Sequence, residues 1–219
     1  MSATLSSNVT KCQDITRFLR LWEKVPVDSS RIKPEQIHAE LVTRYSEPHR
    51  HYHTCEHIGH CLNQLELASA EIDHPAAVGI ALWFHDVIYD PRATDNEQQS
   101  AELFMRWVGD HADPQFSEIV YEAILITKHR EIPRTLTEQF VVDIDLSSFG
   151  LPEPVFDQNS RDIRAEYAHV PDAEFFPAHL KFLESLFAKP TLYFTDFFHT
   201  HYEAIARANF QRLLATAPR

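Results

Sequence analysis

The sequence predicts an all-α protein that forms a single helical domain over residues 1–219. Apolar residues recur at helical spacing in almost every stretch of the chain. Only 4 of the 219 residues are glycine, which leaves few places for tight hairpin turns. The 13 prolines fall mostly between the apolar-periodic stretches, where they separate one helix from the next. A chain of this length can bury a substantial core without disulfides.

The first four helices are expected before residue 90. Residues 13–25 carry apolar side chains at helical spacing, and Pro34 suits the first position of a second helix that contains Ile37, Leu41 and Tyr45. A third helix is expected from about Thr54 to Ile72. Pro75 opens the fourth, PAAVGIALWFHDVIY, which is apolar almost all round and is therefore expected to be buried.

The second half of the chain also reads as helical. Thr94 and Glu97 have the spacing of a capping box, so a fifth helix is expected to begin there and to continue through Trp107. Further helices are expected at residues 114–128, 135–148, 160–170, 173–188 and 196–215, with GLPEP (150–154) as an internal loop. YEAILITKH and QFVVDID have strand-like composition, but their flanks are helical.

Charge and composition exclude several classes of partner. The formal net charge of −12 repels polyanions, so a nucleic-acid polymer is not expected. A small phosphorylated substrate remains compatible with this charge, because a metal ion can reverse the sign locally. Neither a P-loop motif nor a G-x-G-x-x-G motif occurs. The three cysteines, Cys12, Cys55 and Cys61, have no framework spacing and are expected as reduced thiols. No apolar run approaches membrane-spanning length, and we expect a cytoplasmic protein without membrane contact.

Four histidines lie within ten residues in the segment HYHTCEHIGH (51–60). If a helix begins near His53, then His53, His57 and His60 lie on one face, because they are four and three residues apart. His49, His51 and His53 alternate before it and would point to one side of an extended lead-in. Imidazole is the commonest metal ligand, so the cluster is a candidate metal site. The alternative is a set of solvated side chains on a half-exposed helix.

Two more groups of polar residues interrupt strongly apolar segments. His85 and Asp86 are adjacent in ALWFHDVIY, where a buried carboxylate needs a partner. A metal ion would make Asp86 a charged ligand beside His85, and the alternative is a hydrogen-bonded His–Asp pair or a salt bridge to an arginine. Asp143 and Asp145 interrupt FVVDIDLSSF. Residues two apart in a helix point about 200° apart, so at most one of these aspartates is expected to face the same site.

In chain order these residues resemble the HD superfamily of metal-dependent phosphohydrolases. Its pattern is a histidine, an adjacent His-Asp pair and a distant aspartate, all carried by helices. The resemblance implies a helical bundle of the HD type and a metal site formed by His57, His85, Asp86 and Asp145. It favours Asp145 over Asp143, because the last aspartate of the superfamily commonly lies between an apolar residue and a leucine, as in I-D-L.

Two branches of the superfamily are particularly similar. YHTCEH (52–57) resembles the Y-H-N-x-x-H segment of cyclic-nucleotide phosphodiesterases, which implies that His57 is a ligand and that His53 protonates the leaving group, with Thr54 in place of the usual asparagine. A little-characterised bacterial family of predicted metal-dependent HD phosphohydrolases is closer. It implies a metal-site core at about residues 44–170, with C-terminal helices of residues 171–219 packed on it. The matching segments are RYSEPHRHYHT (44–54), WFHDVIYDP (83–91), TDNEQQSAELF (94–104), TKHR (127–130), DIDLSSFG (143–150), AEYAHV (165–170) and EAIARAN (203–209).

The expected reaction is hydrolysis of a small phosphate ester, a nucleotide or another phosphorylated metabolite, by attack of metal-bound water. Tyr89 stands where guanosine-tetraphosphate hydrolases and bacterial 5′-nucleotidases of the superfamily carry a glutamate, and the H-D-x-x-H-P-G and G-Y-P motifs of other branches are absent. The mixed nitrogen and oxygen ligands suit Mn²⁺, Fe²⁺, Zn²⁺ or Mg²⁺.

Several other residues are candidates for the same site. Lys128, with Arg50 behind it, could neutralise phosphate charge, although Lys128 could equally be a solvated helix end. His129 could contact phosphate or hold a second metal ion, and Glu97 could orient water instead of capping a helix. The resemblance also implies that Tyr167 and Arg164 lie near the site. Two other functions remain open: a di-iron oxygenase of the HD fold, and a non-catalytic helical regulator stabilised by its metal.

Overall fold

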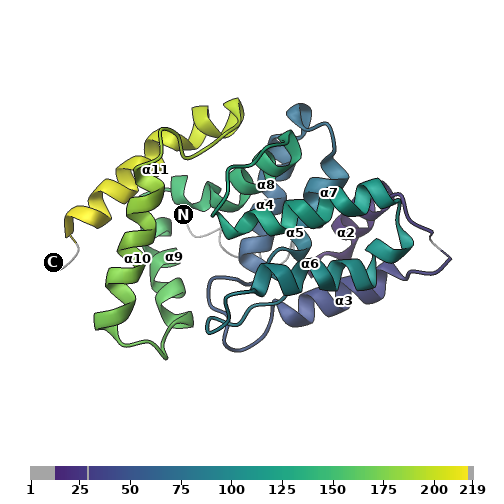
Figure 1. Cartoon of the computed structure of the whole chain (residues 1–219), viewed down its shortest axis with the longest axis horizontal. Coiled ribbons are helices and arrows are strands. Elements are labelled where there is room, and N and C mark those ends of the chain that lie inside the picture. Colours follow the sequence, from purple (N-terminus) through teal and green to yellow (C-terminus); the bar gives the residue numbers. More distant parts are fainter. Residues whose placement is uncertain (1–12, 29, 217–219) are drawn as a thin grey trace.

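The computed structural model describes residues 13–28 and 30–216, and these residues form an all-α fold, as predicted. They contain ten α-helices, labelled α2 to α11 in Figure 1, and four short 3-10 helices. They contain no strand, and their one pair of β-bridged residues is Val27 with Ala112. Cys12 lies outside the described residues, whereas Cys55 and Cys61 are buried and form no disulfide within the described part of the chain. Within the described ranges, no helix combines the length and the apolar character that crossing a bilayer requires.

The first seven of these helices form a bundle around α5. Every residue of α5 from Ala77 to Phe84 is buried, which confirms the expectation of a buried fourth helix. Helices α2, α4, α7 and α8 all contact α5, because its surface is apolar on all sides and must be covered from all sides. In chain order the bundle consists of α2 (Ile15–Trp22), α3 (Pro34–Arg44), α4 (Cys55–Leu67), α5 (Pro75–Phe84), α6 (Asn96–Trp107), α7 (Pro114–Leu125) and α8 (Leu136–Leu146).

The remaining three helices, α9 (Glu153–Glu166), α10 (Asp172–Phe187) and α11 (Asp196–Thr216), lie at one end of the molecule (Figure 1). The 3-10 helix η4 (Ser147–Gly150) joins them to the bundle, and α11 packs on it. Gly150 permits this contact, because a Cβ atom there would lie 2.9 Å from the backbone oxygen of Tyr202. Asn209 completes it by donating hydrogen bonds to the carbonyls of Phe149 and Leu151. Much of the EAIARAN segment therefore serves to attach α11.

Two expected helix boundaries are wrong, and hydrogen bonds to other segments explain both of them. Helix α5 ends at Phe84 instead of continuing through Tyr89, so His85 and Asp86 follow the helix. Helix α6 begins at Asn96 without a side-chain cap. The side chain of Asn96 instead bonds the backbone of Asp90 in the preceding loop, so the expected capping box of Thr94 and Glu97 does not form.

Helix α8 begins at Leu136, close to its expected start at residue 135, whereas α9 begins earlier than expected. A capping box closes the start of α8, where Thr135 and Glu138 bond each other's backbone amides. Helix α9 begins at Glu153, inside the segment expected as a loop, because proline is well suited to the first turn of a helix. The strand-like segments YEAILITKH and QFVVDID lie largely in α7 and α8, in agreement with their helical flanks.

Candidate metal centre

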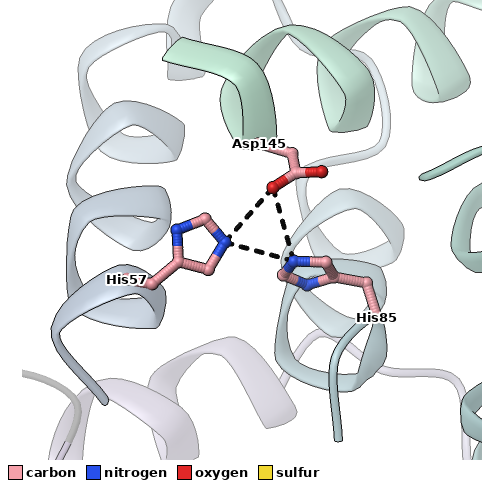
Figure 2. A group of neighbouring side chains, drawn as sticks. All are labelled: His57, His85 and Asp145. Atoms are coloured by element: carbon pink, nitrogen blue, oxygen red, sulfur yellow. Dashed lines mark hydrogen bonds and ion pairs between the residues drawn. The ribbon is translucent and has the colours of Figure 1, made fainter. Parts of the chain in front are cut away.

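Three separate parts of the bundle bring four ligand atoms together. His57 lies in the first turn of α4, His85 and Asp86 directly follow α5, and Asp145 lies near the end of α8. His57 Nε2 is 3.3 Å from His85 Nε2 and 3.2 Å from Asp145 Oδ1. His85 Nε2 is 3.5 Å from Asp145 Oδ1 and 2.8 Å from Asp86 Oδ2. Figure 2 shows three of these side chains, His57, His85 and Asp145, pointing toward one another from their three segments.

These separations fit the ligand shell of one metal ion. Ligand atoms about 2.1 Å from an ion lie about 3.0 Å apart in octahedral geometry and about 3.4 Å apart in tetrahedral geometry. The distances from His85 and Asp145 to their neighbours fall close to these values, and the longest, from His57 Nε2 to Asp86 Oδ2, is 3.8 Å. His57, His85 and Asp145 therefore form a group that could hold a metal ion, with Asp86 beside it.

Hydrogen bonds set the orientation of His85 for this purpose. Its Nδ1–H donates to the carbonyl oxygen of Leu82 at 2.9 Å, one turn earlier in α5. This bond fixes the tautomer in which Nε2 carries a lone pair, and that lone pair faces the two carboxylates. Four acceptor atoms thus converge in a nearly buried space, where the His57 and His85 side chains are each 1% exposed. Converging acceptors repel one another unless a proton or a metal ion lies between them.

The charges of the site lead to the same conclusion. Burial alone would raise the pKa of Asp86 and of Asp145, but the neighbouring histidines lower both values. Burial alone would lower the pKa of His85, but Asp86 and Asp145 raise it well above its ordinary value. In the protein alone, the raised pKa of His85 favours its protonated ring, which offsets part of the carboxylate charge. A divalent cation can take over that role.

Arg50 explains why α5 stops before the His-Asp pair. Its guanidinium donates to the carbonyl oxygens of Asp86 at 2.6 Å and Val87 at 3.0 Å, and more weakly to that of His53 at 3.3 Å. The Nε atom pairs with Glu47. Arg50 is 5% exposed, so its donors are used inside the protein. The expectation that Arg50 supports phosphate binding is therefore wrong: this side chain positions the backbone that carries Asp86.

The two aspartates of α8 have separate environments, as the helical geometry predicts. Asp145 faces His57 and His85, whereas Asp143 is fully buried on another side of α8. There the Asp143 carboxylate accepts hydrogen bonds from the backbone amides of Phe194 and Thr195 and from the Thr195 hydroxyl, at 2.7–3.0 Å. Asp143 therefore anchors the start of α11 to the bundle.

His53, the expected proton donor, lies at the edge of the ligand group. Its Nε2 atom is 4.0 Å from Asp86 Oδ2, and its side chain is 21% exposed. The ring stacks on Tyr89 with centroids 4.2 Å apart and meets Tyr52 edge-on at 4.9 Å. Burial opposes the charged form of His53, but Asp86 and Glu166 together raise its pKa above the ordinary value.

Glu166 is the residue of this site that the sequence analysis did not single out. It is the last residue of α9 and is 4% exposed. Its Oε1 atom accepts hydrogen bonds from the backbone amides of His51, Tyr52 and His53 at 2.8–2.9 Å. Its Oε2 atom accepts from His53 Nδ1–H at 2.6 Å and from the Tyr89 hydroxyl at 2.8 Å. The one sequence signal is its place in AEYAHV, beside Tyr167.

His129 and His60 bond polar groups around the ligand set. His129 has a left-handed backbone, with φ of 54°, and its Nε2–H donates to Asp145 Oδ2 at 3.0 Å. His60 turns away from the ligand set to Ser147, with 2.8 Å between Nε2 and Oγ. Burial lowers the pKa of His60 to about 4, so it is neutral at physiological pH.

The other candidates occupy the surroundings of the site. Lys128 is half-buried in the 3-10 helix before His129. Glu97 is half-buried in the first turn of α6, and its charge adds to burial in raising the pKa of Tyr167. Arg164 instead closes the turn between α9 and α10, through the carbonyls of Tyr167 and Val170 and the carboxylate of Asp172.

Comparison with known proteins adds no relative to these observations, since no protein-family model, curated protein or solved structure matches the chain.

Proposed function

We propose that the protein is a metal-dependent phosphohydrolase of the HD type, and that it cleaves a small phosphate ester such as a nucleotide or another phosphorylated metabolite. One observation carries the proposal. The acceptor atoms of His57, His85 and Asp145 converge at ligand-like separations, with Asp86 beside them, in a nearly buried space that could hold a metal ion. Their order along the chain is that of the HD pattern. The ion would be held by His57, His85, Asp86 and Asp145.

The ion, when bound, supplies a water of lowered pKa and a positive charge for the phosphoryl oxygens. The carboxylates of Asp86 and Asp145 and the imidazoles of His57 and His85 would be its protein ligands. Because Asp86 and Asp145 are almost enclosed, with side chains 16% and 14% exposed, their charge acts in a region of low dielectric constant. Without a metal this negative field would repel a phosphate ester, so metal binding is expected to precede substrate binding.

His53 would act on the leaving group. Its Nδ1–H is committed to Glu166, so Nε2 is the atom free to give up a proton toward the ligand group. Although burial opposes this, the carboxylates of Asp86 and Glu166 raise the pKa of His53, and the bond from Nδ1–H to Glu166 leaves Nε2 as the position of the second proton. As the bond from phosphorus to the leaving oxygen breaks, Nε2–H transfers its proton to that oxygen. Such proton transfer typically contributes about 10²–10⁴-fold to a rate.

The test begins with the metal content of freshly purified protein. It continues with a screen of nucleotides and sugar phosphates in the presence of Mn²⁺, Fe²⁺, Zn²⁺ or Mg²⁺. Asp86→Ala should abolish tight metal binding, and full occupancy in this variant would refute the ligand assignment. His53→Ala should keep the metal and lower turnover by on the order of 10²-fold or more. His199→Ala, an exposed histidine of α11, is the matched control and should behave like the wild type.

Two other outcomes would replace the proposal. Two irons per chain, with oxygen consumption and with loss of metal in His53→Ala, would identify a di-iron oxygenase. The contact of His129 with Asp145 is the observation that would then supply a further ligand. A fully metal-loaded protein that hydrolyses no ester in the screen, but binds one partner protein, would identify a regulator.

A further inference from the structure

Glu166 makes an unusual set of contacts for a residue at its position. It ends a helix, where the backbone carbonyls carry partial negative charge and a glutamate is locally unfavourable. Its side chain is 0% exposed, so water does not compensate for that position. Instead, five hydrogen-bond donors stabilise the buried carboxylate, and all of them belong to residues 51–53 or to Tyr89. The carboxylate therefore contacts the segment that carries His53 and also Tyr89, whose ring stacks on His53.

The two oxygens of Glu166 bind different parts of these surroundings. Oε1 binds three consecutive backbone amides, which fixes the path of residues 51–53 before α4 begins. Oε2 binds the Nδ1–H of the His53 ring. The second contact of Oε2, the Tyr89 hydroxyl, belongs to a ring that stacks on His53. The carboxylate thus holds both His53 and the aromatic ring that covers one of its faces.

We propose that Glu166 and Tyr89 are positioning residues for His53. They hold its ring in the Nδ1–H tautomer, with Nε2 turned toward Asp86. This inference rests on the proposed function, because it states that the proton given to the leaving group comes from Nε2 and not from Nδ1. The Nε2–H bond breaks as a hydrogen bond to the leaving oxygen becomes an O–H bond, and the ring stays protonated on Nδ1. Water then returns a proton to Nε2.

The chemistry of glutamine makes Glu166→Gln a specific test. Glutamine keeps one oxygen for the three backbone amides, so the backbone role is largely retained. Its NH₂ group then faces the Nδ1–H of His53, donor against donor. The ring must give up the Nδ1 proton or turn away. Glu174→Gln makes the same chemical change at an exposed position of α10 and serves as the matched control.

The first measurement does not depend on turnover. Nitrogen-15 NMR of the Zn²⁺-loaded protein, at a pH where the imidazoles are neutral, shows which ring nitrogen of His53 carries the proton, with His53→Gln to assign the signals. We expect an Nδ1–H ring in the wild type and in Glu174→Gln, and an Nε2–H ring in Glu166→Gln. An Nε2–H ring in the wild type would overturn the inference, and this result does not require that the Glu166 variant folds.

The second measurement joins the inference to the reaction. On whichever ester the wild type hydrolyses, Glu166→Gln should lower kcat by on the order of 10²-fold, with metal content and KM unchanged. An unchanged kcat would overturn the inference. If no ester is hydrolysed while the wild-type ring is Nδ1–H and becomes Nε2–H in Glu166→Gln, the proposed function fails and the positioning of His53 stands.

Discussion

Two aspartates of one helix, two residues apart, are expected to respond to the same substitution in opposite ways. Asp143→Asn should destabilise the fold and leave metal binding intact, whereas Asp145→Asn should weaken metal binding. The structural reason is the partners. Asp143 accepts hydrogen bonds from Phe194 and Thr195, at the junction with α11, whereas Asp145 lies against His57 and His85.

The size of the Asp143 effect follows from its contacts. Asparagine keeps one acceptor oxygen and places an NH₂ group against a buried donor. The lost hydrogen bond to a charged group is worth about 1.5–3 kcal/mol, and the donor left unpaired costs about 1–3 kcal/mol. We therefore expect Asp143→Asn to lower the free energy of unfolding by about 3–5 kcal/mol. Burial raises the pKa of Asp143 to about 6, so the comparison belongs at pH 8, where this carboxylate is ionised.

Two assays on the same preparations separate the effects. Urea unfolding of the metal-free proteins measures stability, and titration with Zn²⁺ or Mn²⁺ measures affinity. We expect Asp145→Asn to lose at least about 10²-fold in affinity, because a neutral amide replaces a charged ligand beside two imidazoles. If Asp143→Asn loses metal while Asp145→Asn retains it, the assignment of the two faces of α8 is wrong.

Three further predictions concern pH, metal removal and His129. Burial opposes ionisation of Glu166, but His53 and the backbone amides lower its pKa from the ordinary 4.5 to about 2 in the folded protein. The ionised carboxylate therefore stabilises the fold fully above pH 4.5, and this stabilisation is lost as pH falls toward 2. Acid unfolding of Glu166→Gln should lack this component. Removal of the metal by a chelator should lower Tm, and restoring one equivalent of ion should reverse the change, as calorimetry can show; an unchanged Tm would argue against a bound ion in the fold. Asparagine tolerates the left-handed backbone of residue 129, but His129→Asn removes the hydrogen bond to Asp145 Oδ2. The affinity for metal should therefore fall by about 10-fold or more in a competition assay. Equal affinity would show that His129 does not support Asp145 as a ligand.

The elements and the ligand group could be predicted because both leave local patterns. Apolar periodicity marks the helices, and polar residues that interrupt apolar runs mark the residues now found at the site, namely His85, Asp86 and Asp145. Because residues two apart in a helix point about 200° apart, the sequence also predicts that the two aspartates of α8 face different surroundings. In each case the information lies within a few residues along the chain, where sequence spacing and geometry are directly related.

Other features depend on contacts between distant segments and leave no such pattern. Glu166 lies 113 residues from His53, in a largely polar helix whose other acidic residues are Glu153, Asp157 and Asp162. The end of α5 is set by Arg50, whose donors reach carbonyls 36 and 37 residues away. Arg50 was expected to support phosphate binding because the sequence reveals its positive charge. The sequence does not reveal which backbone carbonyls accept hydrogen bonds from it.

The position of Glu166 in the chain has a consequence for the order in which the site is assembled during synthesis. A chain leaves the ribosome from its N-terminus, and early segments can fold before later ones appear. His57, His85, Asp86 and Asp145 all precede α9, so the nascent chain holds every proposed metal ligand before the partner of His53 has been made. Until α9 emerges, the amides of residues 51–53 lack their carboxylate. Under the proposed function, a ribosome-bound chain can bind its ion before Glu166 restrains His53, and it becomes active only when α9 docks.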